Sequence, residues 1–129
     1  MSNLSKNPRP ADEDAAREAW VAERDAAHHA RDAGLTTAEW HHLERAHILS
    51  QPFALAHVRT HVAMLAFALR QRDRHELVGQ LVRLLVAGPG SATRRYPVGN
   101  TGGANVSAVA PMPIPADLLP VLVGAERIP

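Results

Sequence analysis

Two short histidine motifs contain the residues of this 129-residue chain that could do chemistry. Glu44-x-x-His47 and His57-x-x-x-His61 each place two side chains one helical turn apart, so that both point to the same side of a helix. Imidazole and carboxylate groups are ligands that zinc, copper and iron accept. We therefore predict a transition-metal site formed by Glu44, His47, His57 and His61.

The helix faces that carry these residues are otherwise apolar. Leu43 shares a face with Glu44 and His47, and Met64 and Leu65 share a face with the other motif. A polar group on an apolar face needs a partner, because its burial without one is costly. The same residues fit a second interpretation, a buried Glu–His network that binds no metal and only fixes the helix packing.

Further residues are candidates for supporting roles. Glu23 lies in a stripe of alanines, and we expect it to be another ligand or a general base. Residues that could orient the ligands are His42, Gln51, Glu76 and Gln80. The Gly-rich segment 99–107, with Asn100 and Asn105, is expected to close over the site as a lid. It lacks the lysine of a phosphate-binding P-loop.

The ligand set also bears on the metal and the reaction. Two-iron sites in four-helix proteins use two Glu-x-x-His motifs, whereas this chain has one, so zinc or copper is favoured and iron is the alternative. An open coordination position would allow an oxidoreductase or a hydrolase that acts on a small molecule. A metal-binding protein without turnover, or a metal-free interaction module, fits the same residues.

Helix signals place these motifs on a helical scaffold. Residues 11–33 are rich in Ala, Glu and Arg, begin with acidic residues and end before Gly34. A second helix, capped by Thr36 or Thr37, is expected to run to about Ser50. A third helix follows from Pro52 to about residue 72. Asp73 should cap a fourth helix that ends near 88–90.

These elements predict an all-α fold of two consecutive helical hairpins, either tetratricopeptide-like or a bundle. The helical part spans 11–87, after a disordered leader at 1–10. The segment 88–129 is rich in Gly and Pro, with a short helix expected at 116–123. We expect this tail to belong to the same domain and to wrap over the helices, with disorder as the alternative.

Composition limits the partners. The chain has no cysteine, so disulfides and thiolate metal sites are excluded. Its net charge of +1 offers no basic field for nucleic acid. Its apolar runs are far shorter than the ~20 residues that span a bilayer, and no secretory leader is visible. We expect a cytoplasmic monomer or homodimer.

Several of these motifs together resemble one family. They are His42-Leu43-Glu44-Arg45-Ala46-His47, Gln51, the second histidine pair followed by Met64-Leu65, Gly79-Gln80-x-x-Arg83-Leu84, the Gly99–Ser107 segment and Pro111-Met112-Pro113-Ile114-Pro115. This set is similar to the bacterial domain-of-unknown-function family thirty-seven-zero-three, over about residues 11 to 120. The resemblance implies that the helices and the Gly-Asn tail form one unit, and it implies no activity.

Overall fold

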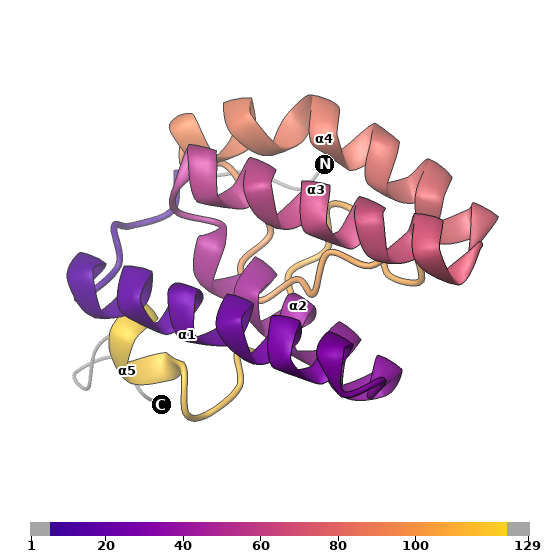
Figure 1. The fold of residues 1–129 in the computed structure, drawn as a ribbon. Helices are drawn as coiled ribbons and strands as arrows, with labels where there is room; N and C mark the ends of the chain where they lie inside the picture. The colour runs from indigo at the N-terminus through magenta and orange to yellow at the C-terminus, as the bar shows by residue number, and fades with distance from the viewer. Residues whose placement is uncertain (1–5, 124–129) are drawn as a thin grey trace.

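The computed structural model describes residues 6–123, and helices dominate that range. They are α1 (Glu13–Asp32), α2 (Thr36–Ser50), α3 (Ala54–Gln71), α4 (Arg74–Ala92) and the short α5 (Leu119–Leu122). α1 packs on α2, α3 packs on α4, and α2 also contacts α3. Figure 1 shows the two helix pairs one above the other. The predicted all-α fold of two consecutive helical hairpins is confirmed.

Aspartates begin the first helix of one hairpin and the second helix of the other. The side chain of Asp12 accepts a hydrogen bond from the backbone N–H of Ala15 at the start of α1. Asp73 does the same for Glu76 at the start of α4, as the sequence predicted. Each carboxylate satisfies a backbone donor that the first turn of a helix leaves free.

The predicted threonine cap of α2 is wrong. Leu35 is the N-cap residue, no side chain caps the helix, and Thr36 is already helical. The reason is the tight turn after α1, where Gly34 has a φ of +72° and the N–H of Leu35 donates to the carbonyl of Ala30. This turn uses the left-handed conformation that glycine favours, and it brings the chain directly into α2.

The predicted end of the fourth helix is also wrong, because α4 continues through Gly88-Pro89-Gly90 to Ala92. Pro89 removes one backbone donor, which a helix near its end tolerates better than one at its centre. Ser91 lies beyond this proline and is buried, and its hydroxyl donates to the carbonyl of Gln51. The last turn of α4 is therefore fastened to the turn between α2 and α3.

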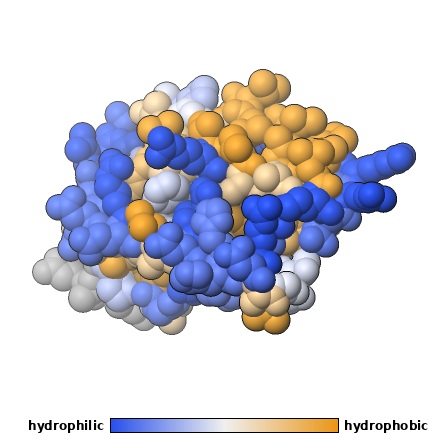
Figure 2. Space-filling view, viewed as in Figure 1, coloured by the Kyte–Doolittle hydropathy of each residue, from blue (hydrophilic) through white to orange (hydrophobic). Residues whose placement is uncertain are grey.

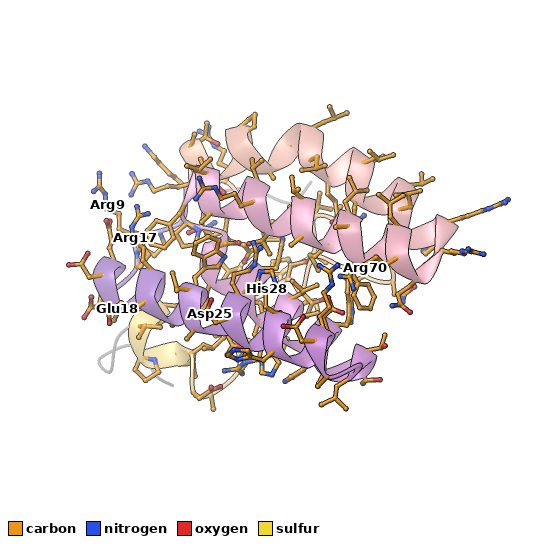
Figure 3. All side chains as sticks on the ribbon, in the orientation of Figure 1. Arg9, Arg17, Glu18, Asp25, His28 and Arg70 are labelled. Carbon is orange, nitrogen blue, oxygen red and sulfur yellow. The ribbon has the colours of Figure 1, made fainter. Side chains whose placement is uncertain are left out.

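Three apolar clusters join the helices. Leu43, Met64, Phe67 and Ala27 form one of them, and Ala16, Phe53 and Ala56 form another. In the third, Leu118 of the tail packs on Ile48 and Leu49 of α2. A bidentate ion pair between Arg70, labelled in Figure 3, and Glu39 also links α3 to α2.

The leader predicted at 1–10 lies partly outside the described residues. Of residues 6–10, Asn7 donates two hydrogen bonds of 2.7 Å, from its backbone N–H to the carbonyl of Arg94 and from its side chain to the carbonyl of Tyr96. No helix in the described part of the chain is both long enough and apolar enough to cross a membrane.

Candidate metal centre

Three histidines from two helices meet in the interior of the protein. His47 comes from α2, and His57 and His61 lie one turn apart on α3. Their Nε2 atoms are separated by 3.0 Å (47 to 57), 3.1 Å (47 to 61) and 3.2 Å (57 to 61). The three residues are only 2–5% exposed. We call this group the histidine triad.

The other ring nitrogen of each histidine faces an oxygen, which fixes the tautomer. The Nδ1 atom of His47 lies 2.6 Å from the backbone carbonyl oxygen of Asn100. A carbonyl oxygen can only accept a hydrogen bond, so Nδ1 of His47 carries the hydrogen.

Gln80 of α4 fixes the tautomer of His61. Its Oε1 atom lies 2.6 Å from Nδ1 of His61. Its amide nitrogen donates to a carboxylate oxygen of Glu76 at 2.7 Å and to the carbonyl of Gly102 at 2.8 Å. Both of these partners are acceptors, so the amide nitrogen of Gln80 must face them and its oxygen must face His61. Nδ1 of His61 is therefore the donor.

Ser91 acts in the same way on His57. Its hydroxyl oxygen lies 2.7 Å from Nδ1 of His57, and its single hydrogen is already donated to the carbonyl of Gln51. The hydroxyl must therefore accept from the imidazole, and Nδ1 of His57 also carries the hydrogen.

These contacts leave three Nε2 lone pairs that point at one another. Burial lowers the pKa of His47 well below its usual value, and it lowers the pKa of His57 to about 3 and of His61 to about 4. The neighbouring imidazoles contribute to the first two shifts. All three rings are therefore neutral at pH 7, and no hydrogen lies between their Nε2 atoms. Such an arrangement suits a bound cation.

The loop that follows α4 closes one side of the triad. Gly102 has a φ of +83°, and a Cβ atom there would lie 2.5 Å from the ring of His47. Only glycine allows this approach. Asn100 holds the same loop, because its side chain donates to the carbonyls of Ser107 and Ala110 and accepts from the N–H of Gly102.

The two carboxylates predicted as ligands, Glu44 and Glu23, lie outside the triad. Glu44 is half-buried and does not join the triad; burial raises its pKa, and the nearby His41 and Thr101 partly oppose this rise. Glu23 accepts from Nε of Arg45 and contacts Nδ1 of His42, each at 2.7 Å. His42 therefore faces Glu23 of α1 and takes no part in the triad.

Only some of the residues predicted to support the site contact the triad with their side chains. The side chain of Gln80 binds a triad histidine directly, whereas Gln51 and Asn100 take part through their backbone carbonyls. The side chain of Gln51 donates instead to the carbonyl of Pro97. Asn105 is exposed.

Sequence reasoning missed Ser91, because it ended the fourth helix before this residue. A signal was nevertheless present. Gln80, Ala87 and Ser91 are spaced by seven and four residues, which places them on one face of a continuous helix, and all three are buried.

The comparison with known families agrees with the resemblance noted in the sequence. A profile described as "Protein of unknown function (DUF3703)" matches residues 14–122, most of the chain. The chain belongs to the DUF3703 family. The matched range includes the triad and all three residues that bind its Nδ1 atoms. No curated protein and no solved structure matches the chain.

Proposed function

We propose that this DUF3703 protein binds a transition-metal ion through the Nε2 atoms of His47, His57 and His61. The observation that carries the proposal is the convergence of three unprotonated ring nitrogens in a buried site. Three neutral ring nitrogens whose lone pairs face one another repel at these distances, and a cation bound by all three would remove that repulsion. The proposed ligand set omits Glu44 and Glu23, because their carboxylates do not join the triad.

The spacing of the nitrogens supports a small first-row metal. Atoms 3.0–3.2 Å apart suit an ion about 2.0–2.1 Å from each of them, with N–metal–N angles of about 100°, near the tetrahedral value. Imidazole ligands alone favour zinc or copper over a two-iron centre, which relies on carboxylates.

The contacts of the Nδ1 atoms resemble the outer shell of established metal sites. A histidine that binds a metal usually donates its other N–H to an oxygen, which orients the ring and makes it a better ligand. Here all three histidines do so, through the carbonyl of Asn100, the hydroxyl of Ser91 and the amide oxygen of Gln80.

Three ligands also leave one position of a four-coordinate ion open. Among the described residues, no fourth histidine or carboxylate joins the group, whereas structural zinc sites have four protein ligands. A water molecule in that position would become a stronger acid and a nucleophile at neutral pH. The proposal therefore extends to metal-dependent chemistry on a small molecule.

Elemental analysis of the whole chain, purified without a metal-affinity tag, tests the proposal. We expect near-stoichiometric zinc or copper in the unsubstituted protein and in His42→Asn, and its loss in His57→Asn. Asparagine retains an N–H near the place of Nδ1, so His57→Asn keeps the donor to Ser91 and removes only Nε2.

The alternative, a metal-free packing network, predicts other results. All three proteins would then lack metal even after incubation with each candidate ion. A chelator would leave their thermal midpoints unchanged, because it lowers stability only where a bound ion contributes to it. That combination would exclude the proposed function.

A further inference from the structure

The outer face of the second hairpin is apolar and exposed. On α4 the side chains of Val78, Leu81, Val82, Leu85 and Val86 are 51–79% exposed, and Val62 and Leu69 of α3 are 51% and 58% exposed. Figure 2 shows apolar residues gathered over the region where α3 and α4 lie in Figure 1. We call these seven residues the apolar stripe.

The stripe is too large for an ordinary solvent-facing surface. Its seven side chains expose on the order of 700 Å², whereas a monomer rarely shows a continuous apolar patch beyond about 300–600 Å². Each partner in a standard interface buries about 800 Å², which is close to this area. From these observations we infer that a second copy of this chain covers the stripe and that the protein is a homodimer joined through α4.

The charges around the stripe favour a second copy as its partner. The charged residue within the α4 part is Arg83, which turns inward to the carbonyls of Gly79 and Val106. The α4 part of the stripe therefore presents no free charge for a partner of opposite charge to recognise. A surface that is apolar throughout matches an identical surface in a two-fold dimer.

The order of residues along α4 also specifies how the copies pair. In an antiparallel arrangement, Val82 of one copy lies against Leu85 of the partner subunit, and Leu81 lies against Val86 of the partner subunit. Antiparallel pairing also places the N-terminal end of one α4 beside the C-terminal end of α4 of the partner subunit, which the helix dipoles favour.

The mass of the chain in solution tests the dimer. Sedimentation equilibrium on the full chain should give about twice 13.9 kDa for the unsubstituted protein at micromolar concentrations. Leu85→Glu should raise the dimer dissociation constant at least about 100-fold, because it introduces a charge at the centre of the interface in both copies. Val109→Glu changes a residue of similar exposure outside the stripe and should leave the dimer intact.

A cross-link provides a second measurement that does not depend on weakening the dimer. The chain has no cysteine, so Val82→Cys introduces a single thiol close to the proposed two-fold axis. Mild oxidation should link Val82→Cys into a covalent dimer and should leave Val109→Cys without a cross-link, as denaturing electrophoresis would show. A monomeric unsubstituted protein at every concentration would overturn the inference, and so would a dimer that persists in Leu85→Glu. Metal content enters none of these measurements, so the dimer and the metal site can fail independently.

Discussion

Two polar clusters contain histidine, one within the first hairpin and one between the two hairpins, and they differ in what their histidines face. His42 lies beside the Glu23 carboxylate, which also accepts from Arg45, and Arg45 in turn pairs with Asp117 of the tail. The Nδ1 atoms of the triad histidines face a carbonyl, an amide oxygen and a hydroxyl. The first cluster balances charge with charge near the surface, whereas the second holds neutral rings whose lone pairs remain free.

Burial and the convergence of three Nε2 atoms distinguish the triad from the partly exposed His42. A carboxylate is itself a common partner for the second ring nitrogen of a metal-binding histidine, so the contact of His42 with Glu23 does not by itself set that histidine apart. Neutral acceptors hold the hydrogen on Nδ1 and leave Nε2 available, and burial keeps the ring uncharged. In the sequence His42 and His47 lie on one helix close to Glu44, and only their tertiary contacts separate them.

Among the changes considered, a fall in pH should lower the free energy of unfolding the most, through the triad. In the metal-free protein the folded-state pKa of His61 is about 4, below the unfolded value of about 6.5, so the unfolded chain binds this proton first as the pH falls. The stability that the neutral ring contributes is complete above pH 6.5 and is lost as the pH falls towards 4. For His61 alone the loss of unfolding free energy is about 3 kcal/mol.

Urea unfolding between pH 7 and 4.5, with a chelator present, measures this dependence. His57→Asn should show a shallower loss, because it removes one of the groups whose pKa is depressed. A stability that stays constant across that range would mean that the triad is not neutral in the folded state, and the contrast with the Glu23 cluster would disappear.

Removing an outer contact of the triad should have a smaller effect. Gln80→Leu takes away the acceptor for Nδ1 of His61, and we expect the dissociation constant of the metal to rise about 10- to 100-fold. Gln51→Leu is the matched control, because that side chain binds only the carbonyl of Pro97. Competition with a chromophoric chelator measures both variants, and equal affinities would remove Gln80 from the site.

The smallest effect is expected in the other cluster. Glu23→Gln removes the negative charge beside His42 and Arg45, and it should lower the free energy of unfolding by about 1 kcal/mol, as partly exposed ion pairs do. The metal content should not change. Thermal unfolding and elemental analysis of the same sample check both statements, and a loss of metal would return Glu23 to the ligand set.

Helical periodicity was sufficient to find the fold and the residues of the triad. His47, His57, His61 and Gln80 lie on faces that the 3.6-residue repeat identifies, and the turns between the helices are marked by Gly34, Pro52 and Asp73. The local spacing of residues therefore carried most of the information about the helices.

The remaining contacts depend on tertiary packing, which spacing does not encode. Glu23 and Glu44 were assigned to the site from their own helix faces, yet the way α1 crosses α2 directs Glu23 to His42 and Arg45. The acceptor for His47 is the backbone carbonyl of Asn100, and a backbone group has no residue type that could reveal it. Ser91 does not follow from the sequence, because Gly88-Pro89-Gly90 predicts the end of a helix that in fact continues to Ala92.

The hydrogen bonds of Asn100 have a consequence for the time an ion would spend in the site. The same residue orients His47 through its carbonyl and holds its own loop closed through its side chain. That loop closes one side of the triad, so its opening would contribute to the rate at which an ion at the triad is exchanged, together with the strength of the metal–nitrogen bonds. A site built in this way would exchange its ion slowly even at moderate affinity.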